Sequence, residues 1–312
     1  MEGAKIMKLI KGDASSRKFF RDKKNKKSKI IILSSTNKKK NLLDYDAVNK
    51  ILIKNKIRAP KLIYQNYEKN FIEVEDFGNE TVFKIFQKCK INKQVKIYKK
   101  IVDELIKLQN IKTKNIKNFK SKNYVIPTYS HKILKKEVDL FFDWYVKYNF
   151  NNKQITNLTK KIRTSIYKFL KSFRLRNKVF VHRDFHISNL ILQNEGICLI
   201  DNQDAVFGSP AYDLCSLVDD VRYETSNNIK NIIINYYLSK TKIKFSKKDF
   251  INDFVIHSIA RNLKIIGIFT RLSVRDKKHH YLKLIPHAWK LIKNRLKNKD
   301  KFNNLKMQLN KL

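Results

Sequence analysis

The sequence is poor in residues that break or cross-link a chain. Its 312 residues include only 6 glycines, 4 prolines and 3 cysteines. So few glycines and prolines argue against long flexible linkers. The cysteines, Cys89, Cys198 and Cys215, are scattered and form neither a CxxC pair nor a dense framework. This pattern excludes a small disulfide-linked scaffold and is typical of free thiols in a reducing compartment.

Long hydrophobic runs are also missing. No apolar run in the sequence approaches the roughly 20 residues that a helix needs to cross a bilayer. The opening MEGAKIMKLIKGDASS has neither the sustained apolar core nor the small-residue cleavage site of a secretory signal. We therefore expect a cytoplasmic protein with no membrane partner.

Acidic residues are scarce, with 27 Asp and Glu against 69 Lys and Arg and a net charge of +42. Such a charge could indicate nucleic-acid binding, because basic patches release counterions from phosphate backbones. The lysines, however, are spread over the whole chain, and the aromatic residues fall at spacings typical of a core. We expect no nucleic-acid partner, and keep a basic nucleic-acid-binding protein as the alternative class. The densest basic segments, 21–29 and 37–40, are predicted to be surface turns.

The apolar pattern divides the chain in two. The first part predicts β-strands at MKLI, RKFF and KIIILSS, a helix over 42–55, and a hairpin made by KLIYQN and NFIEVEDFG. Beyond Gly78, helical patterns dominate, at 95–110, 132–149 and 154–173 and again from Tyr212. Short β-like pieces interrupt them within 179–206. These patterns predict a β-rich lobe over 1–78 and a mainly helical lobe over 79–312.

The interruption within 179–206 carries a spaced set of oxygen-bearing side chains. VHRDFHISN contains Asp184 and Asn189, and Asp201 follows the next apolar run. Oxygens placed in this way can converge on one pocket and suit Mg²⁺, which is commonly shared with nucleotide phosphates. The remaining acid can face an acceptor hydroxyl, because phosphoryl transfer mainly needs positioned groups and neutralised charge. The alternative is that these are ordinary turn residues, since Asp and Asn favour loops.

The segment VHRDFHISNL…ICLIDNQDAVFGSPAYDLCSL resembles the aminoglycoside phosphotransferase and choline kinase family. This resemblance implies an α+β, protein-kinase-like bilobal fold, with a β-rich N-lobe that binds nucleotide and a mainly helical C-lobe. It also implies an ATP- and Mg²⁺-dependent kinase acting on a small molecule. EVDLFFDWYV and RNLKIIGIFTRLSVRDKKHHYL are similar to helices of bacterial kinases that phosphorylate N-acetylmuramate or N-acetylglucosamine at the anomeric hydroxyl during peptidoglycan recycling. Aminoglycoside, choline and homoserine remain alternative acceptors.

The resemblance also implies roles for individual residues. Asp184 would be the catalytic base, His182 and Arg183 would brace its loop, and Asn189 and Asp201 would hold Mg²⁺. GDASSRKFFR resembles a phosphate loop and FIEVEDFG a hinge, which assigns nucleotide binding to five residues: Ser15, Ser16, Arg17, Glu75 and Phe77. Asp213 resembles an acid that ties a helix start to the catalytic loop, and a structural acid at a helix N-terminus explains it equally well.

For the sugar, we single out Gln203 and Asp204, which directly follow the metal acid, and Glu137, Trp144 and Arg261. Trp144 offers a flat face to a sugar ring or packs in the core. Arg261, Lys264 and Arg271 could receive a substrate carboxylate or be solvated helix charges.

The sequence departs from the family at one point. The family places a lysine inside the third strand to hold the nucleotide phosphates, paired with an acid on the following helix. Here Ile30 to Leu33 are apolar and Lys29 stands at the edge of the strand. Arg17 or Lys29 could substitute for that lysine, and Asp44 or Asp46 for the acid. An inactive pseudokinase is therefore a further alternative.

Overall fold

The computed structural model describes residues 6–10, 17–24, 27–150, 153–173, 178–194, 196–297 and 299–312. Ser15 and Ser16 lie outside the described residues. The chain forms two compact units, one made of Met1–Pro127 with Val179–Phe207 and the other of Thr128–Lys178 with Gly208–Leu312. The boundary predicted after residue 78 lies within the first unit, and we keep it as a proposal for the nucleotide-binding lobe.

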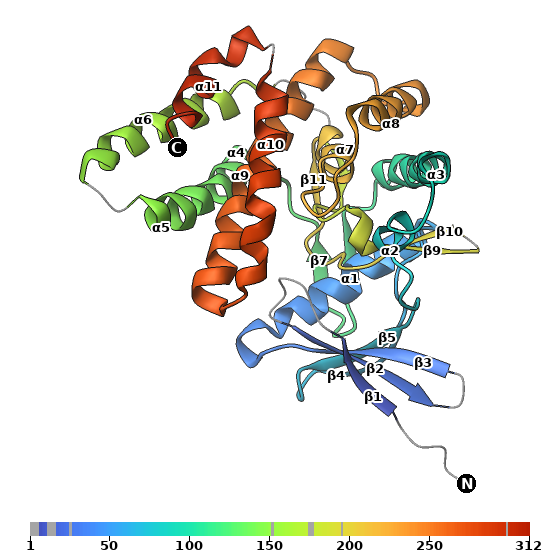
Figure 1. Ribbon diagram of the computed structural model, residues 1–312. Coiled ribbons are helices and arrows are strands. Elements are labelled where there is room, and N and C mark those ends of the chain that lie inside the picture. Colours follow the sequence, from blue (N-terminus) through green and yellow to red (C-terminus); the bar gives the residue numbers. More distant parts are fainter. Residues whose placement is uncertain are drawn as a thin grey trace. The chain divides into compact units, whose positions relative to one another are not determined.

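The first unit contains a five-stranded antiparallel sheet, in agreement with the predicted β-rich start (Figure 1). Its strands are β1 (Ile6–Ile10), β2 (Lys18–Lys24), β3 (Lys27–Leu33), β4 (Leu62–Asn66) and β5 (Phe71–Glu75), in the order β1-β2-β3-β5-β4. The expectation of a turn over the basic segment 21–29 is wrong, because 21–24 and 27–29 belong to β2 and β3. Asp22 lies opposite Lys29, and such cross-strand pairs of opposite charge extend the ladder into the basic segment.

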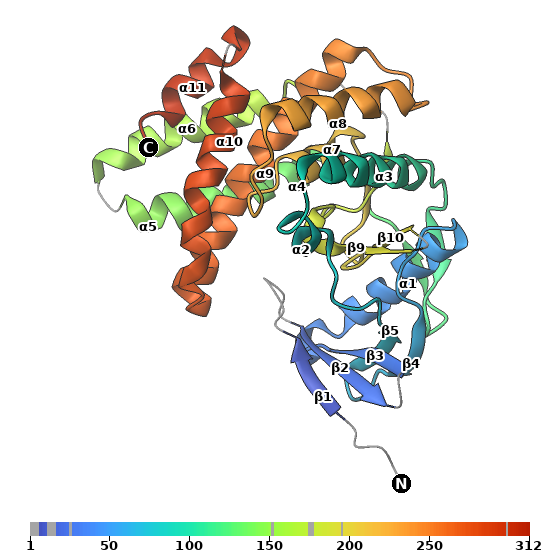
Figure 2. The ribbon, with the colours of Figure 1, turned by 45° about the vertical axis from the view of Figure 1, so that its right-hand side comes forward.

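One helix packs on this sheet. Helix α1 (Lys40–Lys54) follows a short 3₁₀ turn (Thr36–Lys38). This turn takes in the first two residues of the second basic segment, and Lys40 begins α1. Leu42 and Tyr45 of α1 pack against Ile32, Ile72 and Val74 of the sheet, and this small core fixes α1 across one face (Figure 2). The apolar stripe predicted over 42–55 is therefore a helix whose buried side meets β3 and β5.

The rest of the first unit surrounds the motif segment. It contains α2 (Val82–Phe86), α3 (Ile91–Gln109) and the hairpin of β6 (Asn115–Lys117) with β7 (Asn123–Val125). The strands predicted within 179–206 are confirmed as β8 (Val179–Val181), β9 (Leu190–Gln193) and β10 (Gly196–Leu199). Strands β9 and β10 form a hairpin, and β8 pairs with β11 (Val206–Gly208). Helix α3 packs against β8 and β10, which fixes the loops that leave these strands.

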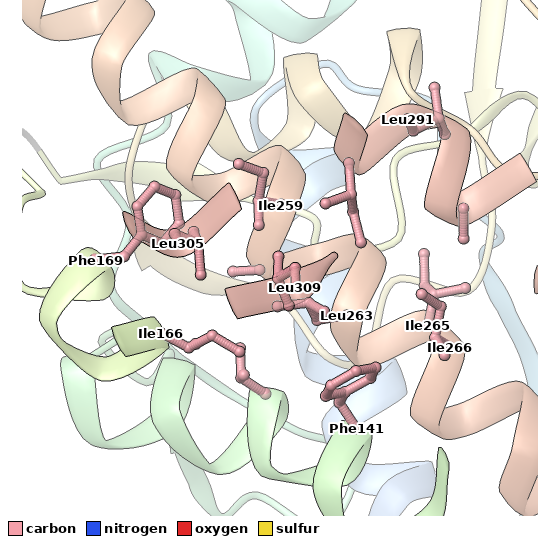
Figure 3. Close-up of a cluster of buried hydrophobic side chains, with 14 of the residues drawn as sticks. Phe141, Ile166, Phe169, Ile259, Leu263, Ile265, Ile266, Leu291, Leu305 and Leu309 are labelled. Atoms are coloured by element: carbon pink, nitrogen blue, oxygen red, sulfur yellow. The ribbon is translucent and has the colours of Figure 1, made fainter. Parts of the chain in front are cut away.

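The second unit is built around the long helix α9 (Lys247–Asp276), which packs against α4 (His131–Leu140), α6 (Lys153–Leu170), α7 (Ala211–Val218) and α10 (Ile285–Leu296). A π-helical segment (Phe141–Val146) and α5 (Lys147–Asn149) continue α4. Helix α8 (Asn227–Lys240), a 3₁₀ segment (His279–Leu284), a second one (Asp300–Phe302) and α11 (Asn303–Leu309) complete the unit. Figure 3 shows its apolar core, where Phe141, Ile166, Leu263 and Leu309 meet from four different segments. No helix among the described residues is long and apolar enough to span a membrane.

A buried ion cluster joins four helices of this unit. The Asp219 carboxylate, at the end of α7, accepts two hydrogen bonds from Arg295 of α10 at 2.8 and 2.9 Å. It also accepts from Lys230 of α8 at 2.7 Å and from Ser258 of α9 at 2.6 Å. Burial alone would raise the pKa of Asp219, but Arg295 and Lys230 hold that pKa at about 2. The carboxylate therefore stays charged and links these four helices.

Candidate active site

The loop between β8 and β9 is held by a fully buried histidine. His182 Nε2 lies 2.7 Å from the Asn202 side-chain oxygen, and His182 Nδ1 accepts a hydrogen bond from the Asp184 N–H at 3.2 Å. The Asn202 amide in turn donates to Asn49 of α1 and to the Leu199 carbonyl. Since Nδ1 accepts, Nε2 carries the proton. His182 therefore contacts the backbone beside Asp184, and its supporting role in catalysis stays a prediction.

Asn189 ends the next turn of the same loop. Its side-chain nitrogen donates to the Asp184 carbonyl at 3.1 Å and lies 3.3 Å from His186 Nε2. These contacts occupy the amide nitrogen, so the amide oxygen is the atom of Asn189 that could hold a cation. Asp184 is half-buried, and its carboxyl group is carried by a loop anchored at both ends.

Two residues of the motif have an unusual backbone conformation. Arg183 has φ 74° and Asp201, just beyond β10, has φ 64°. Side chains larger than glycine rarely adopt positive φ, and such strain concentrates at functional sites. Lys56, Asn70, Ser121 and Lys277 also have positive φ, so the conformation agrees with a functional role for Arg183 and Asp201 but does not by itself mark the site.

Arg17 joins the start of β2 to the end of β10. Its guanidinium donates to Asp201 Oδ1 at 2.6 Å and to the Gln203 side-chain oxygen at 2.8 Å. It lies 5.5 Å from the ring centre of Phe19 and 5.9 Å from that of Tyr45. The Gln203 amide donates onward to the Asp204 carboxylate at 2.8 Å. The structure thus brings four predicted site residues together, in the order Arg17, Asp201, Gln203 and Asp204.

The electrostatics of this group suit a cation. Burial raises the pKa of Asp201, and the nearby carboxylates of Asp184 and Asp204 raise it further, while Arg17 opposes them. Within the described ranges, no three or more His, Cys, Asp or Glu side chains gather as a metal site. A metal here would use a mixed set, the Asp201 carboxylate and the Asn189 amide oxygen, and such hard oxygen donors fit Mg²⁺.

The predicted hinge follows β5. Glu75 is the last residue of that strand, and Phe77 packs with Ile191, Cys198 and Ile200 in a small apolar cluster. The Gln193 amide donates to the Phe77 carbonyl at 3.0 Å, which ties the hinge to the β9–β10 hairpin. An adenine ring requires apolar side chains with a few polar groups beside them, and the nucleotide-binding roles of Glu75 and Phe77 stay predictions.

Sequence reasoning missed the ion pair that fixes this hinge. Arg21 of β2 donates to both oxygens of Asp76, at 2.5 and 2.7 Å, and to the Gly78 carbonyl at 3.0 Å. Burial alone would raise the pKa of Asp76, but hydrogen bonds from Arg21 and from the Gly78 N–H lower it below its usual value. Sequence reasoning also missed Asn202, although this buried amide directly follows Asp201 and could have been considered together with that residue. Tyr45, which lies beneath Arg17, carries no such local signal.

The structure distinguishes the two residues, Lys29 and Arg17, that could substitute for the family's third-strand lysine. Lys29 lies 2.6 Å from Glu73 and 3.8 Å from Asp22, so its ammonium group is held at the sheet. Arg17, by contrast, contacts Asp201 directly. Of the two candidate helix acids, Asp46 pairs with Lys50 at 2.8 Å. Burial raises the pKa of both acids, and the charge of Asp204 raises the pKa of Asp44 further.

The remaining predicted sugar residues belong to the second unit. Glu137 of α4 lies 2.9 Å from Lys264 Nζ and accepts a hydrogen bond from the Tyr129 hydroxyl at 2.6 Å. Arg261 is buried on α9, one turn before Lys264, so the alternative that it is a solvated charge is wrong. Trp144 is half-buried in the π-helical segment. The structure brings Glu137 and Lys264 together, and the binding roles of Glu137, Trp144 and Arg261 stay predictions.

Comparison with solved structures shows that the fold is kinase-like. The ADP-bound aminoglycoside phosphotransferase APH(2″)-Ib superposes with a TM-score of 0.61 over 92% of this chain and 92% of that one, at 14% identity. The model of the phosphotransferase enzyme family matches residues 6–245, and the chain belongs to this family.

Two relatives share a name. The N-acetylmuramate/N-acetylglucosamine kinase of Neisseria meningitidis serogroup B is 25% identical over 88% of this chain and 80% of its own. The protein of the same name from Pseudomonas aeruginosa is 24% identical over 90% of this chain and 80% of its own. The α+β kinase-like fold and the phosphotransferase family expected from the sequence are therefore confirmed.

Proposed function

We propose that this protein is an ATP- and Mg²⁺-dependent kinase that phosphorylates the anomeric hydroxyl of an amino sugar, N-acetylmuramate or N-acetylglucosamine. Three contacts support the reaction type: Asn189 donates to the Asp184 carbonyl, Asp201 lies within electrostatic reach of Asp184, and Arg17 contacts Asp201. The names of the relatives, which match most of the chain, support the choice of sugar. Since the reaction consumes ATP, we place it in the cytoplasm, within peptidoglycan recycling.

In this proposal Asp184 orients the acceptor hydroxyl and takes its proton at a carboxylate oxygen. The buried His182–Asn202 pair keeps the Asp184 backbone in place, because His182 Nδ1 accepts the Asp184 N–H. Asp201 and the Asn189 amide oxygen would hold Mg²⁺, which when bound neutralises charge on phosphate oxygens. Phe77 and the backbone around Glu75 would receive the adenine.

The acceptor would be recognised by polar side chains. Gln203 and Asp204 directly follow the metal acid, and Asp204 is exposed, so it can hydrogen-bond sugar hydroxyls. We assign Glu137, Trp144 and Arg261 to the sugar as well. Arg261 supplies a cation for the lactyl carboxylate of N-acetylmuramate, and Trp144 supplies a flat apolar face.

The test is an ATP-consumption screen over N-acetylmuramate, N-acetylglucosamine, choline and kanamycin, with phosphorus NMR to locate the phosphate. We expect an anomeric phosphate on an amino sugar. Asp184→Asn should lower kcat at least 10³-fold with little change in the unfolding midpoint, because it removes the base without altering side-chain volume. The matched control is Asp300→Asn, which changes an exposed aspartate of the second unit.

Two outcomes would contradict the proposal. Phosphorylation of kanamycin or choline, but of neither sugar, would move the protein to an alternative acceptor class. Absence of turnover on every acceptor, together with RNA affinity that falls steeply with salt and survives Asp184→Asn, would favour the nucleic-acid-binding alternative instead.

A further inference from the structure

The apolar third strand poses an electrostatic problem for the proposed function, on which the following inference rests. Nucleotide phosphates need a fixed cation from the protein as well as Mg²⁺. Ile30, Ile31 and Ile32 of β3 supply none, and Lys29 at the edge of the strand is paired with Glu73. The cation must come from another element that reaches the end of β10.

Arg17 is a basic side chain that the structure holds against Asp201 itself, whereas Arg183 donates to the Asp204 carbonyl at 3.3 Å. The Arg17 side chain is only 6% exposed, yet its guanidinium contacts Asp201 Oδ1 at 2.6 Å and Gln203 at 2.8 Å. Phe19 and Tyr45 lie beside it, and Tyr45 is fixed in the core between α1 and the sheet. A guanidinium keeps its charge when it is buried and presents several donors in a plane, so it can bind a carboxylate or a phosphate equally well.

The partner of Arg17 is the proposed metal ligand, and this has a consequence for binding order. While Arg17 holds Asp201 Oδ1, a divalent cation competes with the guanidinium for the same carboxylate. If phosphate oxygens attract Arg17 away, Asp201 is left beside Asp184 and Asp204 with its charge unbalanced, which favours a divalent cation.

We propose that Arg17 replaces the third-strand lysine and exchanges partners during nucleotide binding, from Asp201 to the phosphates. In the nucleotide-free protein Arg17 neutralises Asp201 and keeps its affinity for metal low. Binding of nucleotide and binding of metal are consequently coupled, each favouring the other by the same factor.

The experiment measures Mn²⁺ binding by the loss of the free-ion EPR signal, with and without ADP, on the full chain. For the wild-type protein we expect at least tenfold tighter Mn²⁺ binding when ADP is present. Without ADP, Arg17→Gln should bind Mn²⁺ at least tenfold more tightly than wild type. The factor by which ADP tightens Mn²⁺ binding should fall towards one in this variant. Arg17→Gln should also raise the KM for ATP more than it lowers kcat.

Two further variants keep the result interpretable. Arg17→Lys retains the charge and should behave between wild type and Arg17→Gln, which covers the case where the glutamine variant does not fold. Arg275→Met removes an arginine that pairs with Asp276 on the surface of the second unit, and should change neither binding constant. Thermal unfolding of each variant confirms that folded protein is compared.

The outcomes separate this inference from the proposed function. Suppose that wild type binds Mn²⁺ in the presence of ADP, and that Arg17→Gln has the same Mn²⁺ dissociation constants as wild type with and without ADP. Arg17 then does not control metal binding at Asp201, and the proposed kinase function stands without this inference. If wild type binds neither ADP nor Mn²⁺ with ADP, the proposed function fails and the inference fails with it.

Discussion

At the scale of single residues, His257 shows how burial alone can create a pH dependence. Its ring lies among Phe173, Tyr212 and Tyr129, and within the described part of the chain neither ring nitrogen has a hydrogen-bond partner. Burial disfavours the charged imidazolium and lowers the pKa of His257 to about 3; the distant charge of Glu137 opposes this shift, and His131 adds to it. His257 is therefore neutral in the folded protein throughout the physiological range.

The consequence is a loss of stability in mild acid. Between pH 6.5 and pH 3 the unfolded chain protonates this histidine and the folded protein does not, so the free energy of unfolding falls as the pH drops. We expect His257 to account for about 2 kcal/mol of the loss between pH 7 and pH 5. Urea unfolding at the two pH values should show this loss in wild type and a smaller one in His257→Leu.

The exposed His280 provides the control for that comparison. His280→Gln should keep the wild-type difference between pH 7 and pH 5, because an exposed imidazole meets nearly the same solvent in both states. An unchanged pH dependence in His257→Leu would show that the buried imidazole is protonated in the folded protein.

The same scale shows what the sequence could predict of the site. Asp184, Asn189 and Asp201 could be proposed from the sequence because they lie on one short segment, where spacing along the chain still reflects spacing in the fold. The contact between Arg17 and Asp201 joins residues 184 positions apart, and the pair of Arg21 with Asp76 joins residues 55 apart. No local pattern carries such contacts, because the sheet and α1 create them.

At the scale of elements, one close approach between helices of the second unit depends on a glycine. Gly267 of α9 faces the junction of α4 with the π-helical segment, and a Cβ there would lie 2.3 Å from both the backbone carbon and the oxygen of Leu140. Helix propensity alone predicts that Gly267→Ala would stabilise the protein by about 1 kcal/mol. Because backbone atoms cannot move aside as a side chain can, we expect the opposite sign.

Gly267→Ala should lower the free energy of unfolding by about 2–3 kcal/mol, in the range of overpacked cores. The measurement is urea unfolding followed by circular dichroism, and the control is Lys248→Ala on the exposed start of α9, which should stay within about 0.5 kcal/mol of wild type. A stabilised Gly267→Ala would mean that α4 and α9 are further apart than the structure has them.

The elements themselves were largely predictable. The stripes at 95–110 and 154–173 are α3 and α6, because amphipathic periodicity directly reflects one buried face. The stripe at 132–149 predicted one continuous helix, whereas the structure widens it into a π-helical turn at Phe141–Val146. In that π-helical turn the ring of Phe141 packs against Tyr145 and against Trp289 of α10. The departure from an α-helix thus coincides with packing against another helix, which the local sequence does not reveal. The β6–β7 hairpin was missed because three-residue strands leave almost no periodic signal.

At the scale of the whole molecule, the excess of positive charge is the dominant feature. There are 69 basic residues and 27 acidic ones. Several of the acids, such as Asp219 and Asp76, already form buried ion pairs. Most of the described lysines are exposed. Folding brings these like charges closer than they are in the unfolded chain, so their repulsion opposes the folded state.

Salt should therefore stabilise this protein. The Debye length falls from about 30 Å at 0.01 M to about 10 Å at 0.1 M ionic strength, which screens exposed charges but leaves buried pairs nearly intact. We expect Tm to rise by about 3 °C or more between 10 and 300 mM NaCl. The variant Lys93→Glu/Lys96→Glu/Lys100→Glu, on the exposed face of α3, should show a smaller rise because it removes part of the repulsion. A Tm that falls with salt in wild type would mean that attraction between opposite surface charges outweighs the repulsion, despite the composition.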